Sequence, residues 1–293
     1  MVVKRSISNI IFDISNYLFL TLLMVITLYP FWHVIMASFS NHVELTAHTG
    51  LLLRPAGFSL DAYKAVLDNR MIYSGYRNTL FYVVIGTALN LIMTSMGAYV
   101  LVRKGFFWRR FIFTLILITM FFSGGLIPTY LLVQSLGLVD SIWALILPGL
   151  ISTWNLIIMR TNFASVPDSV IESSTIDGAN EFVTLFRIML PLSLPVIAVM
   201  TLYYGVHHWN AWFGAMIYLR SRSLYPLQLI LREILLANDT NSMMVGVGHT
   251  DRESVSETIK YATIMAATLP ILCAYPFVQK YFVKGVMIGA VKG

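Results

Sequence analysis

Six long apolar runs alternate with polar segments along the chain. They cover residues 16–39, 78–102, 111–133, 141–159, 192–219 and 261–283. Each run is long enough to cross the hydrocarbon core of a bilayer, which takes about 20 helical residues. The first run is too long for the apolar part of a signal peptide, and no small-residue cleavage site follows it, so we interpret it as a retained helix. The pattern predicts an all-α polytopic membrane protein with six transmembrane helices, whose single domain covers residues 1–293.

Glycines and prolines interrupt several of these runs. In most places they are typical of kinks and of close packing through small residues, which membrane helices tolerate. The stretch FSGGLIP at residues 122–128 concentrates both residue types near the middle of the third run. We expect the helix to break there.

Composition agrees with a membrane protein. Hydrophobic residues make up 57% of the chain and charged residues only 12%, about half of the roughly 25% found in soluble domains. The net charge of +6 could indicate nucleic-acid binding, but the basic residues cluster at the ends of the apolar runs, as membrane-flanking charges do. We therefore expect contact with membrane lipid and no nucleic-acid partner. The only cysteine, Cys273, lies inside an apolar run, so neither a disulfide framework nor a Cys/His metal site is predicted.

The positions of the basic residues also predict the orientation, because lysine and arginine favour the cytoplasmic side. With six spans, the basic clusters all fall on the side of the two termini. These clusters consist of Lys4 and Arg5, then Arg103, Lys104, Arg109 and Arg110, and finally Lys280, Lys284 and Lys292. We expect both termini to be cytoplasmic, together with the polar segment between the fourth and fifth runs.

Each of the two long external segments is predicted to contain a short helix. In residues 40–77, a Pro-Ala-Gly turn leads into a helix that starts near Ser59. The apolar stripe of this helix would consist of Ala62, Val66 and Leu67. In residues 220–260, YPLQLILREILL predicts a second helix, and the tract ANDTNSMMVGVGHTDRESVSE that follows is too polar to pack well.

Several catalytic signatures are absent from the sequence. No GxxxxGK[ST] phosphate loop is present for ATP hydrolysis by that route, and neither HExxH nor GxSxG occurs. None of the six runs contains an Asp or Glu, which ion-coupled carriers and proton pumps normally keep near the midplane. We expect a chain that is not an enzyme and that binds no cofactor itself. A sodium site built from backbone carbonyl groups keeps an ion-coupled carrier open as an alternative.

Aromatic and amide side chains crowd the fifth run, in the stretch YYGVHHWNAWFGAMIY. Sugars present flat apolar C–H faces and hydroxyl groups, so a sugar cavity needs aromatic rings beside amides or imidazoles. The candidates for a substrate path are Tyr203, Tyr204, His208, Trp209, Asn210 and Trp212, with Asn155 beside Trp154 in the fourth run. An aromatic belt at the membrane interface is the alternative explanation. A metal site at His207 and His208 is disfavoured, because adjacent helix positions point about 100° apart.

The polar segment 162–191 predicts a short helix-turn-helix. Ser165 is suited to be the N-cap of its first helix, since a proline and an acid follow in the first turn. Gly178 is placed to end that helix in the left-handed conformation. A second helix is expected around residues 181–189, with Pro191 at the entry to the fifth run. A mere connection would need only a few residues, so we expect docking to a cytoplasmic partner, with a plain interfacial linker as the alternative.

Within this segment, Glu172, Gly178, Ile188, Leu190 and Pro191 keep the spacing Glu-Ala-Ala, three residues, Gly, nine residues, Ile-x-Leu-Pro. This pattern resembles the EAA loop in the membrane subunits of bacterial ABC importers. Ser173 and Ser174 replace the two alanines, which is a small-for-small change. Asp177-Gly178-Ala179 resembles the version in carbohydrate importers.

The resemblance extends over essentially the whole chain, from YPFWHVIMASFS in the first run to YFVKGVMIGAVKG at the end. It is strongest to sugar permeases with the maltose-importer type of core. The stretch FSGGLIPTYLLV is similar to members that import larger, often uronate-containing oligosaccharides, including alginate.

The resemblance implies a type I ABC importer permease fold with several partners. A second, usually non-identical permease subunit would complete the translocation path, and an extracytoplasmic solute-binding protein would deliver the sugar. Two ATPase subunits would bind ATP and Mg and move the permease through its loop. The protein would be a multi-pass component of the bacterial cytoplasmic membrane.

The same resemblance implies which residues couple to the ATPase. They are Glu172, Ser173, Ser174, Asp177, Gly178, Ala179, Leu190 and Pro191. Glu172 would offer its carboxylate to a basic or backbone donor, and Gly178 would form the turn. Besides the ion-coupled carrier, an ABC importer permease for a non-sugar solute such as an amino acid or peptide stays an alternative.

Overall fold

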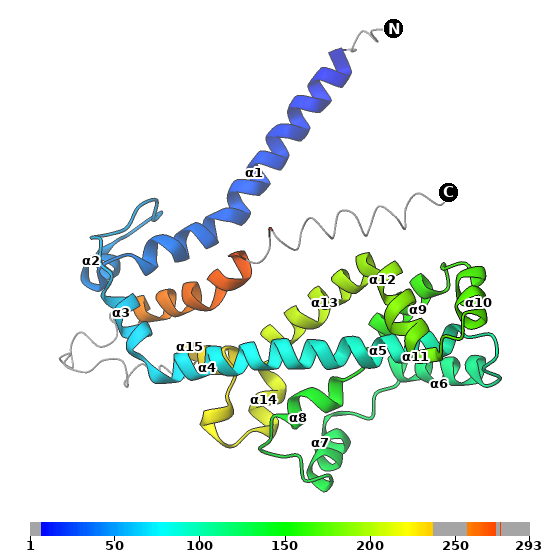
Figure 1. Cartoon of the computed structure of the whole chain (residues 1–293). Helices are drawn as coiled ribbons and strands as arrows, with labels where there is room; N and C mark the ends of the chain where they lie inside the picture. Colours follow the sequence, from blue (N-terminus) through cyan, green and yellow to red (C-terminus); the bar gives the residue numbers. More distant parts are fainter. Residues whose placement is uncertain (1–6, 237–256, 274–275, 277–293) are drawn as a thin grey trace. The chain divides into compact units, whose positions relative to one another are not determined.

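The computed structural model describes residues 7–236, 257–273 and 276 of the 293-residue chain. Over these residues the regular elements are helices, joined by turns and irregular segments, and one isolated β-bridge joins Ser40 and Phe58, which confirms the all-α class (Figure 1). The predicted polar tract and the basic residues near both termini lie outside the described residues. The chain divides into two structural units, Met1–Arg70 with Glu233–Leu269 and Met71–Arg232 with Pro270–Gly293. The single-domain organisation stays a prediction.

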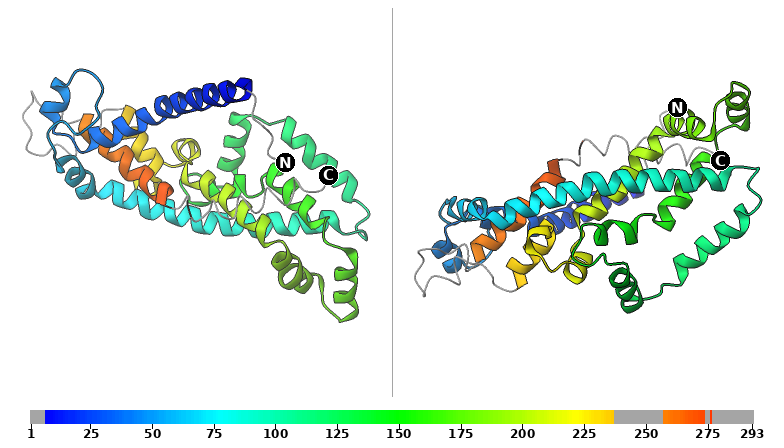
Figure 2. Two further views of the ribbon diagram at one scale, coloured as in Figure 1. Left: turned by 90° about the horizontal axis from the view of Figure 1, so that it is seen from above. Right: turned by 60° about the horizontal axis from the view of Figure 1, so that its bottom comes forward.

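Two helices of the described residues are long and apolar enough to cross a membrane by themselves. The first is α1 (Ile7–Ser38). The second is the continuous rod Arg70–Val102, which consists of α4 (Arg70–Phe81), the π-helical segment η1 (Tyr82–Gly86) and α5 (Thr87–Val102). Both views of Figure 2 show this rod as one helix, drawn in cyan.

Three further segments reach the length of a span only as bent pairs of helices. The bend is 118° between α6 (Arg109–Phe121) and α7 (Leu126–Ser135), 52° between Trp143–Gly149 (α8 and η2) and α9 (Thr153–Phe163), and 89° between Glu181–Leu192 and α13 (Leu194–Trp209). The first bend confirms the break expected in FSGGLIP, where Gly125 has a φ of 87° that only glycine adopts cheaply. Counting each pair as one span gives five in the described residues, so the six-span count stays a prediction.

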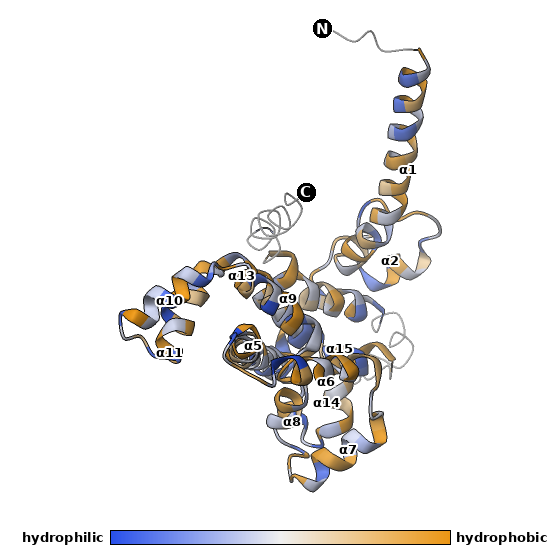
Figure 3. Cartoon of the chain, turned by 90° about the vertical axis from the view of Figure 1, so that its right-hand side faces the viewer, coloured by the Kyte–Doolittle hydropathy of each residue, from blue (hydrophilic) through white to orange (hydrophobic). Residues whose placement is uncertain are grey.

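In the first unit, the segment after α1 folds back onto the end of that helix. The indole N–H of Trp32 donates to the carbonyl of Leu53 over 3.1 Å, and the backbone N–H of Leu52 donates to the hydroxyl of Tyr29 over 3.1 Å. The rest of α1 exposes apolar side chains along its length, as helices that contact lipid or a partner protein do. Figure 3 shows hydrophobic residues, in orange, along this helix. Residues 257–273 are also helical, and Tyr261 meets the ring of His33 edge-on.

The predicted helix in the first external segment is α3 (Asp61–Asp68), preceded by α2 (His42–Ala47). Ala62 and Val66 are buried as expected, but Leu67 is 78% exposed, so its place in the apolar stripe was wrong. Ala62 and Val66 are four residues apart and share a face, whereas Leu67 lies about 100° further around the helix.

In the second unit, α5 packs against α9 and α13, and buried polar side chains of α5 bond to α13 and to the segment that precedes α9. The Asn90 amide donates to the carbonyls of Gly149 and Leu150 over 2.9 and 2.8 Å, and its oxygen accepts from Nε2 of His208 over 2.7 Å. Gly86 lies against the same imidazole, and a Cβ there would come within 2.5 Å of the ring. A side chain at position 86 would collide with His208, which explains the glycine at this position of the rod.

The helix expected in YPLQLILREILL is confirmed as α15 (Leu227–Leu236). The short segments α14 (Phe213–Tyr218) and η4 (Arg222–Leu224) lead to it. Three side chains of the rod hold this connection by hydrogen bonds to its backbone. They are Asn78 to the carbonyls of Ser223 and Tyr225, Thr79 to the N–H of Leu227, and Tyr82 to the carbonyl of Leu224.

Asp140 joins two connecting segments of this unit. Its carboxylate accepts hydrogen bonds from the N–H groups of Arg220 and Ser221 over 2.8 and 2.7 Å, and from the Ser221 hydroxyl over 2.6 Å. The Ser221 hydroxyl, followed by the two backbone groups, holds the pKa of Asp140 below its usual value. Its φ of 62° is one that Asp and Asn tolerate better than other side chains.

A carboxyl group whose pKa is lowered in the folded state stabilises that state above its unfolded pKa of about 3.9, and the contribution is lost as pH falls through the folded pKa. We therefore expect Asp140→Asn, which keeps the backbone preference, to lower the apparent Tm of the purified protein by a few degrees at pH 7. The difference from the unmodified protein should shrink toward pH 3. Thermal unfolding in detergent measures it, with the exposed Asp68→Asn as control. A difference independent of pH would contradict this role.

Candidate functional site

The polar segment between α9 and α13 forms the predicted helix-turn-helix. Its first helix is α10 (Asp168–Ile176), and its second part runs through α11 (Glu181–Val183), η3 (Thr184–Met189) and α12 (Leu190–Leu192). The N-cap expected at Ser165 was wrong. Ser165 still belongs to the turn that ends α9, and its hydroxyl donates to the carbonyl of Asn162 over 2.7 Å. The helix begins only after Pro167, without a side-chain cap.

The turn at Gly178 agrees with the prediction. Gly178 has a φ of 80°, and the N–H groups of Gly178 and Ala179 donate back to the carbonyls of Thr175 and Ser174 over 3.1 and 2.9 Å. This arrangement is a left-handed C-terminal cap, which favours glycine. Asn180 then caps the next helix, since its side chain accepts from the N–H of Val183 over 2.9 Å.

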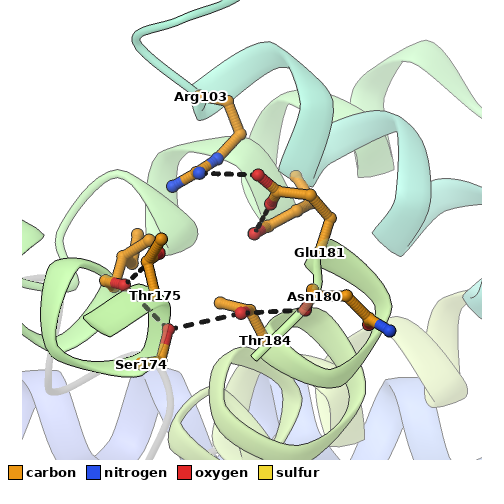
Figure 4. A network of polar contacts seen from close by, with 8 residues as sticks. Arg103, Ser174, Thr175, Asn180, Glu181 and Thr184 are labelled. Carbon is orange, nitrogen blue, oxygen red and sulfur yellow. Dashed lines mark hydrogen bonds and ion pairs between the residues drawn. The ribbon is translucent and has the colours of Figure 1, made fainter. Parts of the chain in front are cut away.

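The two serines that replace the alanines of the EAA pattern have different surroundings. Ser174 is buried between the two helices, where its hydroxyl donates to the carbonyl of Ile171 over 2.7 Å and lies 3.3 Å from the Thr184 hydroxyl (Figure 4). Ser173 is exposed, and its hydroxyl bonds to the carbonyl of Val170 within the same helix. The substitution therefore buries no unsatisfied polar group, which would otherwise cost stability.

The remaining predicted coupling residues divide into an exposed set and a packed set. Glu172, Asp177, Gly178 and Pro191 are exposed, whereas Ala179 is half-buried and Leu190 packs against the core of the unit. Ile176 is 86% exposed at the end of α10, and Phe182 is exposed on the following helix. An apolar surface with acidic neighbours at the tip of a loop is typical of a protein-interaction site. We call Glu172, Ile176, Asp177 and Phe182 the tip surface.

Two ion pairs connect this loop to the end of α5, and the sequence analysis missed them. The Arg103 guanidinium donates to Glu181 over 2.7 Å, and the Tyr99 hydroxyl donates to the other oxygen of the same carboxylate (Figure 4). Lys104 pairs with Asp168 at the start of α10. The available signal was an Arg-Lys pair after the second run and an acid at the start of each helix of the loop, but which charges pair depends on tertiary contact.

A cavity of about 640 Å³ lies between α9, α13 and the break that precedes α9. Its lining includes three of the predicted substrate-path residues, Asn155, Tyr203 and Tyr204. Trp154, Ser152 and His207 contribute further polar or aromatic groups, and the remaining lining is apolar. The Tyr204 hydroxyl is held by Thr94 at 2.7 Å and by the N–H of Ser152 at 3.1 Å, so its ring has a fixed position in the wall.

The other predicted substrate-path residues do not line this cavity. His208 is buried against Asn90, and Trp209 is buried beside it. The Asn210 amide donates to the carbonyl of Val206 over 3.0 Å at the end of α13, and Trp212 lies under the Arg232 guanidinium at 4.2 Å. Residues 203 and 207 share a face of α13 that lines the cavity. Residues 204 and 208 share the face toward α5, and of these two only Tyr204 also lines the cavity. A substrate role for the four residues that do not line the cavity stays a prediction.

The described residues offer no candidate metal centre, since no three His, Cys, Asp or Glu side chains gather in that part of the chain. The site consists of an exposed polar loop and a polar-aromatic cavity, both in the second unit. Residues 92–288 match the family of binding-protein-dependent transport system inner membrane components. The chain belongs to this family. It is thus a membrane component of such a transport system.

Several characterised relatives are similar over nearly their whole length. The polygalacturonan/rhamnogalacturonan transport system permease protein of Bacillus subtilis is 42% identical over 285 residues, which cover 97% of this chain and 99% of the relative. An arabinooligosaccharides transport system permease protein of the same organism is 29% identical over 97% of both chains. In the crystal structure of a bacterial ABC transporter involved in the import of the acidic polysaccharide alginate, one chain superposes with a TM-score of 0.87 at 31% identity, covering 96% of this permease and 100% of that chain.

The ion pair between α5 and the loop makes a specific prediction for the permease in its complete transporter. Arg103→Glu or Glu181→Arg should lower substrate-stimulated ATP hydrolysis several-fold, and combining them should restore part of it. The pair is partly exposed, so its contribution to stability should stay below about 1 kcal/mol. ATPase assays and thermal unfolding on the three variants separate the two effects.

The exposed pair of Lys64 with Asp61 in α3 provides the matched control, since it has the same charges and lies outside the loop. Exchanging Asp61 and Lys64 should leave stimulated hydrolysis unchanged. Equal losses in the single and the charge-reversed double variants of Arg103 and Glu181 would show that the pairing itself does not matter.

Proposed function

We propose that this permease forms half of the translocation path of an ATP-driven importer of oligosaccharides, with uronate-containing sugars as the substrate class. The observation that carries the proposal is the rigid polar loop, whose exposed tip surface is presented by a glycine turn and tied to α5 by two ion pairs. Such a loop on a chain without a phosphate-binding motif fits coupling to a separate ATPase.

The contacts in the second unit form a path from the loop to the cavity. Force on α10 or α11 reaches the end of α5 through Asp168 with Lys104 and through Glu181 with Arg103. Farther along the same helix, Thr94 holds the Tyr204 hydroxyl in the cavity wall. Because α5 is a continuous helix, displacement at its end is transmitted as movement of the wall rather than absorbed by bending. Each step of this path is an ion pair or a hydrogen bond between side chains.

The cavity fits a sugar by size and chemistry. Its volume of about 640 Å³ lies within the range of about 300–1,000 Å³ for small-molecule sites. Trp154 and Tyr203 offer aromatic faces, while Asn155 and His207 offer hydrogen bonds. The lining contains no Asp or Glu among the described residues, so a uronate would meet no like charge. The names of the relatives, which include polygalacturonan and alginate systems, support the same substrate class.

The family and the lack of a phosphate-binding motif in this sequence indicate which partners the permease needs. We infer a second, non-identical permease subunit, an extracytoplasmic solute-binding protein and two ATPase subunits that bind ATP and Mg, with no cofactor on this chain. The permease would lie in the bacterial cytoplasmic membrane with both termini in the cytoplasm. The exposed apolar side chains of α1 and α6 would then face lipid or the second permease subunit.

Docking of the loop is tested by Glu172→Lys in the tip surface. Reversal of an exposed interface charge should lower co-purification of the ATPase roughly tenfold or more while the permease stays in the membrane. Asp68→Lys is the matched control, since it reverses an exposed acid of α3 outside the loop. Full ATPase retention with unchanged sugar-stimulated hydrolysis in Glu172→Lys would refute the coupling role. Uptake that survives loss of the ATPase and follows an ion gradient would support an ion-coupled carrier.

The cavity is tested by a pair of tryptophans. Trp154 lines the cavity and is 57% exposed, whereas Trp143 in α8 is 41% exposed and does not line it. Trp154→Ala should reduce uptake of a galacturonate oligosaccharide about tenfold without loosening the ATPase, as expected for loss of an aromatic contact. Trp143→Ala should leave uptake close to the unmodified level. Equal uptake by both variants would favour the aromatic-belt explanation.

A further inference from the structure

A second cavity, of about 520 Å³, lies where the end of α5, the start of α6, the end of α9 and the start of α10 meet. It is distinct from the candidate sugar cavity and shares no lining residue with it. Four basic residues from three parts of the chain line it, and Asp168 is its only acidic residue. The basic residues are Lys104, Arg109, Arg110 and Arg160.

The protein itself neutralises little of this charge. Lys104 pairs with Asp168, which leaves three arginines without an ion pair among the described residues. The Nε of Arg160 is buried and has no hydrogen-bond partner there, while its guanidinium lies 4.2 Å from the centre of the Phe113 ring. Buried donors of this kind are normally satisfied, so the site has the properties of an incomplete anion site.

Membrane orientation alone does not explain this arrangement. Basic residues that determine topology need only remain on the cytoplasmic side, where they can spread out in solvent. Here Arg160 comes from a different helix from Arg109 and Arg110, and all three converge on one cavity. Like charges that line one cavity repel one another, and an anion between them would offset that repulsion.

The surface next to the cavity indicates what kind of anion binds. α6 begins at Arg109 and has no buried residue, and its exposed apolar side chains continue from the cavity along the helix. These side chains are Phe111, Leu115, Ile118 and Phe121. Phe107 and Trp108 are exposed immediately before α6, as aromatic residues at a membrane interface are. A ligand that fits has an anionic head and apolar chains.

We propose that this cavity binds the headgroup of an anionic glycerophospholipid, whose acyl chains lie along the exposed face of α6. The phosphate accepts hydrogen bonds from Arg110 and Arg160, and the glycerol backbone lies at the level of Trp108. Pro167, Asp168 and Ile171 of the coupling loop form part of the cavity wall. The bound headgroup therefore holds the start of α10 against α5, α6 and α9, and makes the loop position sensitive to the lipid around the transporter.

Native mass spectrometry of the complete transporter in detergent tests the proposal, with phosphatidylglycerol as the probe and phosphatidylcholine as the neutral comparison. We expect phosphatidylglycerol to be retained preferentially, and Arg110→Gln to weaken its retention roughly fivefold. Arg160→Gln should have a similar effect, and agreement between the two variants guards against a folding defect in either. Arg187→Gln, an exposed arginine of η3 outside the cavity, should retain the lipid normally.

Three outcomes would overturn the proposal. Equal retention of both lipids, or unchanged phosphatidylglycerol retention in both cavity variants, would show that the cavity does not select the headgroup. If millimolar inorganic phosphate displaces the bound lipid as effectively as added phosphatidylglycerol does, the cavity is a site for free anions. Loss of the ATPase from the cavity variants at unchanged lipid retention would identify an acidic segment of that subunit as the occupant. Sugar uptake is not part of the readout, so the lipid site can fail while the transport function stands.

Discussion

The break between α8 and α9 depends on one side chain, the amide of Asn90. A helix that breaks within an apolar environment leaves backbone groups without partners, and each unsatisfied group costs several kcal/mol. The Asn90 amide donates to two carbonyls at the break before α9, and its oxygen is held by His208 of α13. One fully buried residue of α5 thus satisfies the break and joins three segments. The cavity lined by Asn155 and Tyr204 lies next to this junction.

The same helix supplies the contacts of both functional regions. At its end, Arg103 and Lys104 bind the acids that begin α11 and α10 of the polar loop, and nearer its middle Thr94 holds Tyr204 of the cavity wall. The loop itself is rigid for local reasons, since Gly178 closes one helix and Asn180 caps the next. A rigid loop attached to a continuous helix can transmit a displacement. A flexible loop would lose it in backbone motion.

Two sequence predictions were wrong, because a short local pattern fixes neither the exact start of a helix nor its rotation. Ser165 has the right chemistry for an N-cap, but the helix begins only after Pro167. Leu67 is apolar like Ala62 and Val66, but a step of one position along a helix turns a side chain by about 100°. The same rotation separates the candidate substrate-path residues, whose role stays a prediction. Leu67 consequently faces outward, His208 and Trp209 face the packed interior, and Tyr203 with His207 face the cavity. Composition shows which residues can bind a sugar, but only the helix rotation selects among them.

Local chemistry in the sequence was sufficient for the all-α class, the break at FSGGLIP, the helix in YPLQLILREILL and the glycine turn of the loop. These features depend on apolar run length and on the φ that glycine permits, which are properties of short segments. Tertiary structure alone decided the pairing of Arg103 with Glu181, the junction at Asn90, and the convergence of Arg109, Arg110 and Arg160 on one cavity. The partners in these contacts lie about 50 to 120 positions apart along the chain. No local pattern specifies which charges and amides meet, because that is determined by how the helices pack.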